Sequence, residues 1–434
     1  MRRDSSRIRG AETRVPAMGA RRALKRRRSE SPGLARAAAA NAGDSAAPRD
    51  RGWYNPDRRK GRNRPPKPYR RWFEAEGDRS LSSSKGDSFL LISYNILGDN
   101  NAFNHRDLYW NIPCDIMKWN SRKGLICREI IHWNADLEVD RYEDILVHMK
   151  RKEYAGCYKG RSGDAKDGCA IFWKEKRFRL LEEESIDFSS IGLRNNVAQL
   201  LVFEVDEASK LVVGNIHVLF NPKRGDIKLG QIRMFLLKAD ALSRKWDSIP
   251  ILLAGDFNST PDSAIYKFLS TSELNISEHD RRHLSGMDNC QFGLYAFPSF
   301  LKFKWTNDEV RNATGYSKSE QVKHPLKLRS SYATIQGNAR TRGPQGEPLA
   351  TSYHSKFLGT VDYIWYSTGL ECRKVLDTLP IDTLRKTGGL PTKEMGSDHL
   401  ALVAEFVFTE PSELDHPHST DDSAEEETII SKSV

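Results

Sequence analysis

Residues 211–258 read LVVGNIHVLFNPKRGDIKLGQIRMFLLKADALSRKWDSIPILLAGDFN, and their hydrophobic pattern indicates a strand, a helix and a second strand. Leu211–Val218 and Ile249–Ala254 are short apolar runs of the kind that form buried strands. Between them, residues 227–242 place apolar side chains along one face of a helix. This order of elements favours an α/β domain.

Further elements are predicted on both sides of this stretch. The chain first becomes apolar at Phe89–Tyr94, and Trp119–Trp133 has the spacing of an amphipathic helix. The other expected strands are Cys169–Trp173, Val197–Glu204, Val361–Tyr366 and Leu400–Phe408. We therefore expect a folded domain over residues 85–409. Within it, the polar stretch of about 308–351 predicts a long surface insertion.

The two ends of the 434-residue chain carry opposite charge. Residues 1–80 contain 23 Lys and Arg against 9 Asp and Glu, whereas residues 409–434 contain 1 against 8. Because both ends lack apolar periodicity, we expect a disordered basic arm over residues 1–84 and a disordered acidic tail over residues 410–434. The arm suits a polyanion, and the aromatic residues among its arginines suit stacking on bases. The alternative is a solvated tail whose aromatic residues dock on the domain.

The sequence predicts an intracellular protein of the nucleus and cytoplasm. No apolar stretch reaches the roughly 18–20 residues of a membrane span, and the N-terminus lacks the apolar segment of a secretory signal. The six cysteines show neither CxxC spacing nor the density of a disulfide scaffold, which fits a reducing compartment. The run Lys25–Arg28 is typical of a nuclear-import or phosphate-binding patch, with an organelle transit peptide as the alternative.

Polar side chains recur at the ends of the predicted strands, where a sheet can bring distant parts of the chain into one crevice. They are Asn95, His217, Asp256, Asn258, Asp362, Asp398 and His399. Oxygen-rich sets of this kind suit Mg²⁺ or Mn²⁺, and the lack of a His and Cys cluster argues against structural zinc. Taken singly, each residue has a plainer interpretation, because Asn and Asp are common turn formers and a single histidine is often structural.

Three short motifs give these residues a shared context. Residues 93–95 read SYN, residues 255–261 read GDFNSTP, and residues 397–399 read SDH. Gly255 permits a close backbone approach, and Asp398 can orient the imidazole beside it. In this order the motifs resemble the endonuclease/exonuclease/phosphatase superfamily.

Longer matches point to the carbon catabolite repressor 4 deadenylases within that superfamily. The chain resembles them over about Phe89–Phe408, including SYNIL (93–97), DGCAIFW (167–173), NVAQ (196–199), VDYIWY (361–366) and GSDH (396–399). The resemblance implies two packed mixed β-sheets flanked by helices, a four-layer α/β sandwich. It also implies 3′-to-5′ shortening of single-stranded poly(A) RNA to 5′-AMP with Mg²⁺ or Mn²⁺, as two ions.

The basic arm looks like that of the plant-type short homologues, which lack a leucine-rich repeat. In the yeast-type protein this repeat docks the enzyme on the Not complex, so docking of that kind is in doubt here.

The resemblance also implies roles for individual residues. Four of them would hold or surround the metal ions: Asn95, Glu138, Asp362 and His399. Asp256 would align or deprotonate the attacking water, and Asn258 would position the phosphate or the base. His217 would stabilise the charge that develops in the transition state.

Pro222 and Phe357 match the residues that hold an adenine in this family by stacking. The alternative is structural, with Pro222 turning the chain before the helix and Phe357 filling the core.

The chain departs from the family just before Glu138. Family members have a complete apolar strand that ends in Gln-Glu-Val, whereas here residues 134–137 (NADL) run directly into Glu138. About four residues are missing, which at roughly 3.3 Å per residue removes on the order of 13 Å of strand. We therefore predict that Glu138 cannot reach the metal unless the preceding helix is displaced or unwinds, or the strand is lost.

Three functions remain open from the sequence. The leading hypothesis is a poly(A)-specific exoribonuclease. The second is a phosphatase or phosphodiesterase that acts on a small nucleotide or on an RNA 3′ end, because this superfamily hosts several phosphate chemistries. The third is a catalytically impaired homologue that binds RNA or a protein complex, which the shortened strand favours.

Overall fold

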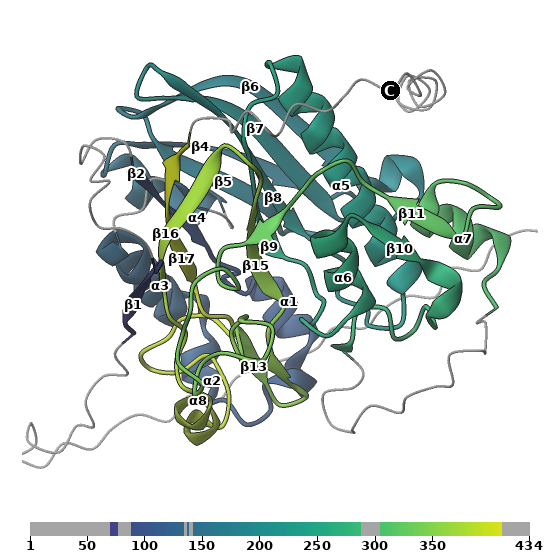
Figure 1. The fold of residues 1–434 in the computed structure, drawn as a ribbon. Helices are drawn as coiled ribbons and strands as arrows, with labels where there is room; N and C mark the ends of the chain where they lie inside the picture. The colour runs from purple at the N-terminus through teal and green to yellow at the C-terminus, as the bar shows by residue number, and fades with distance from the viewer. Residues whose placement is uncertain (1–69, 77–87, 134–136, 139–141, 288–303, 410–434) are drawn as a thin grey trace, which may run out of the picture. The chain divides into compact units, whose positions relative to one another are not determined.

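The computed structural model describes residues 70–76, 88–133, 137–138, 142–287 and 304–409, within one compact unit that spans Pro66–Val434. Two β-sheets form its centre (Figure 1). The first sheet has the strand order β1 (Trp72–Glu74), β16 (Leu370–Leu376), β17 (Leu402–Phe408), β2 (Ser88–Ser93), β3 (Leu137–Glu138), β5 (Gly168–Lys174) and β4 (Tyr154–Gly160). The second sheet has the order β12 (Arg329–Ser330), β15 (Asp362–Tyr366), β9 (Ile251–Asp256), β8 (Ser209–His217), β7 (Val197–Val205) and β6 (Phe178–Asp187). Two short strand pairs join β10 (Glu273–Asn275) to β11 (Gln321–Lys323) and β13 (Ser352–His354) to β14 (Phe357–Gly359).

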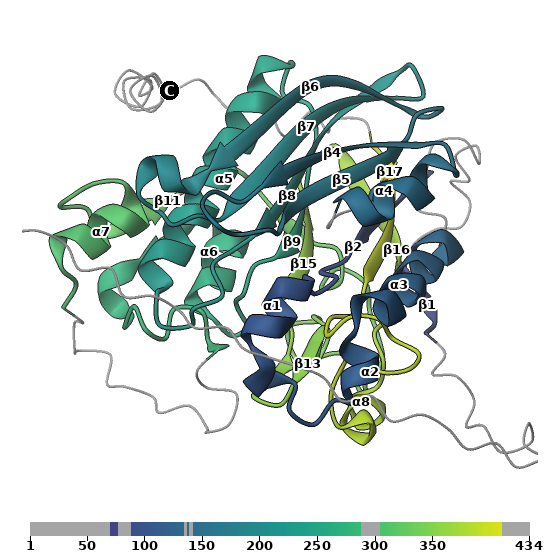
Figure 2. The ribbon, with the colours of Figure 1, turned by 180° about the vertical axis from the view of Figure 1, so that it is seen from behind.

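Helices lie on the outer faces of both sheets (Figure 2). On the first sheet lie α3 (Trp119–Trp133) and α4 (Tyr142–Lys150), and on the second α5 (Gly225–Lys245) and α6 (Ala264–Thr271). The other helices are α1 (Asp99–Asn104), α2 (Cys114–Met117), α7 (Asn307–Thr314) and α8 (Ile381–Thr387), with 3-10 turns at Arg106–Leu108, Phe188–Ile191 and Ile276–Glu278. None of the helices within the described ranges is long and apolar enough to cross a membrane.

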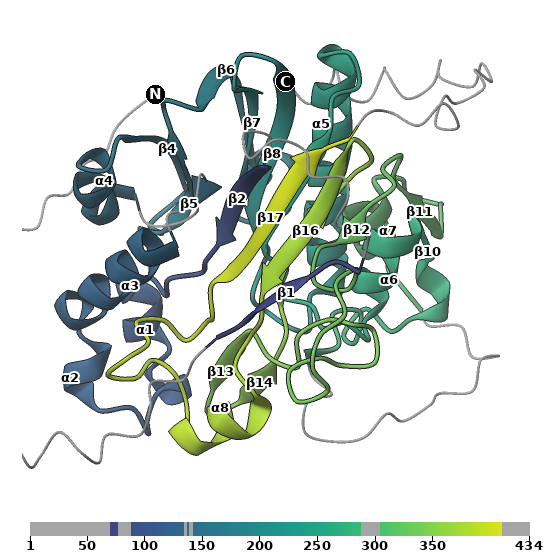
Figure 3. The ribbon, with the colours of Figure 1, turned by 60° about the vertical axis from the view of Figure 1, so that its left-hand side comes forward.

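A hydrophobic cluster between the two sheets holds them face to face (Figure 3). Leu91 and Phe406 come from the first sheet, and Phe203, Leu252 and Ile364 come from the second; none of these side chains exposes measurable surface. Each buried side chain of this size contributes about 1.5–3 kcal/mol. The predicted fold of two packed mixed sheets flanked by helices is therefore confirmed.

The register of three neighbouring strands brings the polar strand ends together. β8 runs parallel to β9 and places His217 beside Asp256, while β15 runs antiparallel and places Asp362 opposite Asp256. Gly255 makes this arrangement possible: its φ is +137°, and a Cβ there would overlap the carbonyl oxygen of Ile216. The expectation that Gly255 allows a close backbone approach is confirmed.

Two predicted boundaries differ in the structure. Trp72–Glu74, expected in the disordered arm, forms β1, where Trp72 packs edge-on against Trp133 with ring centroids 5.9 Å apart. Residues 308–351 are not only a surface insertion, because they include most of α7 and the buried residues Tyr332 and Glu347. Their polar composition hid this, because polar residues such as Ser331, Glu347 and Thr351 are themselves buried. The rest of the arm up to residue 69 and the tail from residue 410 lie outside the described residues.

Candidate active site

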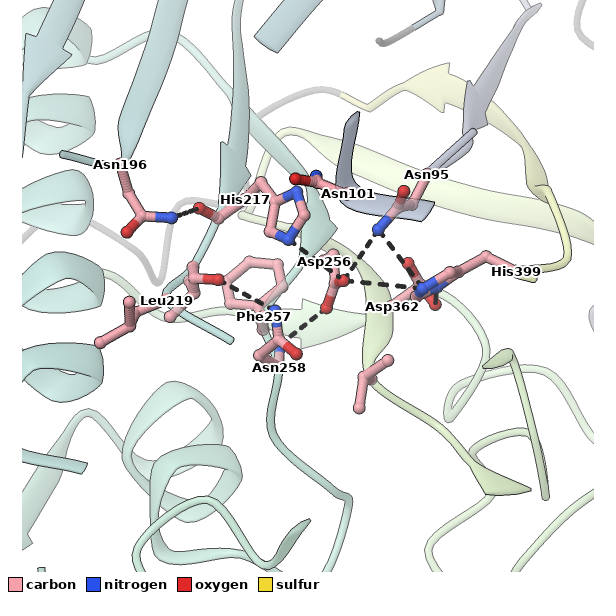
Figure 4. A network of polar contacts seen from close by, with 12 residues as sticks. Asn95, Asn101, Asn196, His217, Leu219, Asp256, Phe257, Asn258, Asp362 and His399 are labelled. Carbon is pink, nitrogen blue, oxygen red and sulfur yellow. Dashed lines mark hydrogen bonds and ion pairs between the residues drawn. The ribbon is translucent and has the colours of Figure 1, made fainter. Parts of the chain in front are cut away.

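Three side chains suited to binding a metal meet where strands of the two sheets end. Asp256 ends β9, Asp362 begins β15 and His399 precedes β17; their ligand atoms lie within 4.8 Å of one another, and all three residues are buried. Asn95, just after β2, joins them: its Nδ2 donates to Asp256 Oδ2 at 3.0 Å and lies 3.3 Å from His399 Nε2 (Figure 4).

Asn95, Asp256 and His399 line a cavity of about 190 Å³. Seven of the residues singled out in the sequence face it: Asn95, His217, Asp256, Asn258, Phe357, Asp398 and His399. Asp362 lies directly behind His399, with its Oδ2 2.8 Å from His399 Nδ1. The structure thus brings together nearly all the residues that the resemblance assigned to a site.

The environment of Asp256 makes its carboxylate more basic. Burial raises the pKa of Asp256, and the carboxylate of Asp362 raises it further, whereas His217 and His399 lower it without reversing the shift. A buried carboxylate with a raised pKa is suited to accepting a proton from water.

His399 is oriented by Asp362 and not by its neighbour Asp398. Burial lowers the pKa of the His399 imidazole, but Asp362 and Asp398 outweigh burial and raise this pKa to about 10. The His399 Nε2 lies 3.9 Å from Asp398 Oδ1, beyond hydrogen-bonding distance. Asp398 instead accepts a hydrogen bond of 2.6 Å from the Tyr109 hydroxyl. The prediction that Asp398 orients the imidazole is therefore wrong, because adjacent residues of an extended chain point in different directions.

The loop after β9 folds back on Asp256. Asn258 has a φ of +47°, and its backbone amide donates to Asp256 Oδ1 at 2.8 Å. The Asn258 side chain donates to the carbonyl of Val218 at 2.9 Å, and the buried ammonium of Lys228 donates to the Asn258 carbonyl at 2.6 Å. These contacts fix the Asn258 amide at the cavity wall.

His217 reaches the site from the end of β8. Its Nε2 lies 3.6 Å from Asp256 Oδ2, and its side chain remains 29% exposed, so the ring faces both the carboxylate and the cavity. The Asn196 side chain donates to the His217 carbonyl at 3.0 Å and fixes the backbone there.

The chemistry of this group fits a divalent cation. Asp256 and Asp362 lie directly opposite each other on paired strands, and burial, together with repulsion from the Asp362 carboxylate, raises the pKa of Asp256. A cation removes that repulsion, and hard cations such as Mg²⁺ prefer carboxylate and amide oxygens. Thr351 donates to Asp362 Oδ2 at 2.5 Å and holds this carboxylate in place.

The backbone of Glu138 lies short of this group. In β3, Leu137 pairs with Leu91 and Glu138 pairs with Phe172. Glu138 is therefore level with Ile92, three residues before Asn95, and β5 reaches the site at Cys169 and Gly168, three and four residues from Phe172. At roughly 3.3 Å per residue this separation is about 10–13 Å along the strand. Helix α3 still runs to Trp133, so the helix has not unwound to lengthen β3.

The two stacking residues expected from the resemblance are placed differently. Phe357 is buried, with 6% exposure, and lines the cavity. Pro222 lies in the turn before α5 and is not among the described residues that line the cavity; Phe220, two residues earlier, does line it and lies beside His105. Phe220 was missed because an aromatic residue after a strand usually indicates core packing.

Other residues of the site gave no recognisable signal in the sequence. They are Tyr109, Arg161, Thr351 and His354, all within hydrogen-bonding or cavity-lining distance of the group. Asn196 lies in the NVAQ motif and could have been found from it. Tyr109 and Thr351 lie in loops, and Arg161 and His354 lie at the ends of β4 and β13, where the sequence does not show which distant residues they meet.

The fold and the site define a class of enzymes that cleave phosphate esters with the help of a metal ion. Residues 92–399 match the family model described as the Endonuclease/Exonuclease/phosphatase family, and the chain belongs to that family. Members of this family are typically metal-dependent.

Within the family, the chain is similar to carbon catabolite repressor 4 homologues. It is 53% identical to "Carbon catabolite repressor protein 4 homolog 3" of Arabidopsis thaliana over 357 residues, which cover 78% of this chain and 79% of the relative. It is 24% identical to the "CCR4-Not complex 3'-5'-exoribonuclease subunit Ccr4" of Mycosarcoma maydis, covering 83% of this chain and 58% of that protein.

A solved structure with the same fold is that of ANGEL2, described as a 2′,3′-cyclic phosphatase, in complex with adenosine-2′,3′-vanadate. Its TM-score is 0.64 at 28% identity, and the match covers 78% of this chain and 99% of that one. The named relatives thus include an exoribonuclease subunit and a 2′,3′-cyclic phosphatase.

Proposed function

We propose that this protein is a metal-dependent 3′-to-5′ exoribonuclease that shortens poly(A) and releases 5′-AMP. The observation that carries the proposal is one cavity that Asp256, His399 and the aromatic ring of Phe357 all line, with Asp362 completing the possible metal-binding group behind His399. Such a cavity offers phosphate chemistry and a stacking surface for a base side by side. The 53% identity to a carbon catabolite repressor 4 homologue supports the same function.

Each residue has a role that its geometry allows. Mg²⁺ or Mn²⁺, as two ions, would polarise the phosphate and stabilise its added charge. Asp256 accepts a proton from the attacking water as the new P–O bond forms, and the bond from phosphorus to the 3′ oxygen of the shortened RNA breaks. The leaving 3′ oxygen takes a proton from solvent. His217 donates to a phosphate oxygen, and Asn258 holds the phosphate in line.

A second candidate is hydrolysis of a 2′,3′-cyclic phosphate at an RNA end. The similarity to ANGEL2 favours it, because that structure holds an adenosine-2′,3′-vanadate and has the same fold at 28% identity. The same carboxylate and histidine groups can serve both reactions, since each begins with attack of water on a phosphate diester.

A third candidate is a catalytically impaired RNA-binding homologue. The register of β3 favours it, because the backbone of Glu138 lies about three to four residues short of the site.

One experiment distinguishes the three candidates. The full chain is incubated with Mg²⁺ and 5′-labelled oligo(A) that ends either in a free 3′ hydroxyl or in a 2′,3′-cyclic phosphate, with oligo(U) and a dinucleotide phosphate as comparisons. Stepwise shortening of oligo(A) that EDTA abolishes supports the exoribonuclease. Loss of the cyclic phosphate alone supports the second candidate, and binding without cleavage supports the third.

The proposed partner is single-stranded poly(A) RNA, with a Not-type complex as a further partner of the same pathway. We also propose that the protein acts in the nucleus and cytoplasm. Imaging of a tagged chain and of one without residues 25–28 tests the location, and loss of the nuclear signal on deletion would support import through this basic run.

A further inference from the structure

Besides Phe357, the cavity is lined by two aromatic rings that contact each other. Phe220 follows β8, and His105 follows α1; their ring centroids lie 5.9 Å apart, with planes inclined by 50°. Both rings line the cavity that holds Asp256.

These two rings differ from Phe357 in their exposure. Phe357 is 6% exposed, whereas Phe220 is 42% exposed and His105 is also exposed. A half-exposed ring at the mouth of a polar cavity offers a larger free face than a ring that the cavity almost encloses.

The exposed pair lies beside the hairpin that carries Phe357. The Ser355 amide of this hairpin donates to the Leu108 carbonyl at 3.0 Å, and the Lys356 ammonium lies 2.5 Å from Asp107 Oδ2, two residues after His105. Phe357 belongs to the β13–β14 hairpin, which is joined to the His399 side by the bridge between Ser352 and His399.

We propose that Phe220 and His105 bind the base of the second nucleotide of the RNA substrate, the one that precedes the scissile phosphate. This inference rests on the proposed function. An exonuclease holds two nucleotides at its site, one on each side of the phosphate that it cleaves. The buried Phe357 then binds the base of the 3′-terminal nucleotide, which the cavity encloses. The exposed pair binds the preceding base at the mouth, from where the rest of the RNA leads to solvent.

Stacking explains why an aromatic pair would serve here. A base that lies on an aromatic ring contributes binding through its flat face, which all four bases share. The imidazole of His105 adds a hydrogen-bonding edge beside the ring of Phe220. The pair therefore positions the RNA backbone without strict preference for the base. The enclosed Phe357 site, in contrast, can select among bases by their shape.

The test measures RNA binding without cleavage. Full-length protein carrying Asp256→Asn, which suppresses turnover, is titrated with Mg²⁺ and fluorescent oligo(A), and the anisotropy gives the Kd. The same titration uses two analogues that lack one base, either at the 3′-terminal or at the second nucleotide. The variants are Phe220→Ala, Phe220→Trp and, as a matched control, Tyr316→Ala, whose ring is 46% exposed but does not line the cavity.

Phe220→Ala should weaken binding of intact oligo(A) roughly tenfold, and Phe220→Trp should restore it. On the analogue without the second base, Phe220→Ala and its parent should bind equally, while the loss should persist on the analogue without the terminal base. A Phe220→Ala Kd equal to that of Tyr316→Ala, or a loss that persists on the analogue without the second base, would overturn the proposal.

The failure of the proposed function can be recognised separately. If the binding pattern is as expected but the wild-type chain does not shorten oligo(A), the aromatic site stands and the exoribonuclease function does not. If oligo(A) does not bind at all, both are contradicted.

Discussion

Replacing Asp256 with asparagine should remove turnover and leave the fold intact. The amide keeps the shape of Asp256, but with one acceptor oxygen it can keep only one of the hydrogen bonds from the Asn95 side chain and the Asn258 backbone, and it cannot accept a proton from water. Loss of a general base lowers kcat by about 10²–10⁴-fold. Because the change also removes repulsion with Asp362, the melting temperature should stay equal or rise. Near wild-type kcat would show that Asp256 only shapes the turn.

Glu347 should make stability depend on pH. Burial raises the pKa of this carboxyl to about 7, and its contacts with Ser330, Tyr266 and Arg342 only partly offset burial. Between pH 4.5 and 7 the folded chain therefore binds more protons at Glu347 than the unfolded chain. The contribution of this group to stability is complete below pH 4.5 and is lost as the pH rises through 7.

The matched variant is Glu347→Gln, which keeps an acceptor for the Tyr266 hydroxyl, now 2.8 Å from Glu347 Oε1. Urea unfolding at several pH values should show a smaller decline between pH 4.5 and 7 for the variant than for the wild type. Parallel curves for the two proteins would mean that Glu347 titrates normally.

At the scale of elements, helix α3 positions two site loops through one side chain. The guanidinium of the fully buried Arg122 donates to the carbonyl of Ile96 at 3.0 Å and to that of Gly396 at 3.3 Å. These residues adjoin Asn95 and the SDH motif. Arg122→Met leaves the carbonyls without this donor, at about 1–3 kcal/mol each. Turnover should fall at temperatures where the chain is still folded. Arg128→Met, on the exposed side of α3, should change neither turnover nor the free energy of unfolding.

The length of β3 determines whether Glu138 takes part in catalysis. Inserting three apolar residues and a glutamine between Leu137 and Glu138 extends this strand by about 13 Å, enough to cover the distance from its present register to the site. The extended chain should bind Mg²⁺ more tightly and turn over about a hundredfold faster, because misplacement by even 1 Å has an effect of that size. Isothermal titration and deadenylation assays on both chains test this. Equal rates and equal affinities would mean that the site works without Glu138.

The regular elements could be predicted from the sequence, and the connections between them could not. The strands that end in His217 and Asp256 have uninterrupted apolar runs, and the helix between them has a clear apolar face. In contrast, apolar and polar residues alternate only weakly in β6 (Phe178–Asp187), because charged residues cover its exposed side. The partners Thr351 and Tyr109 lie in loops, where contacts form across more than ten residues or between distant segments and leave no periodic pattern.

At the scale of the whole chain, the basic arm should control affinity for long RNA. Lys and Arg near phosphates release counterions, so binding that involves the arm weakens as salt rises. Deleting residues 1–69 should leave turnover of a short oligo(A) largely unchanged but flatten the salt dependence of long-RNA binding. Filter binding at several KCl concentrations measures this slope. A slope that does not change would assign the arm no part in RNA binding.

Because β2 pairs with β17, the site can form only after most of the chain has been synthesised. Ser93 lies beside Leu402, and Asn95 meets His399 across 304 positions of sequence. On the ribosome, β2 emerges long before β17. The first sheet therefore stays incomplete until β17, which lies between β16 and β2, has been synthesised. A nascent chain of 390 residues already contains Asp256 and Asp362 yet has no complete site. The site can therefore form only after synthesis has passed His399, and a chain truncated before His399 cannot assemble it.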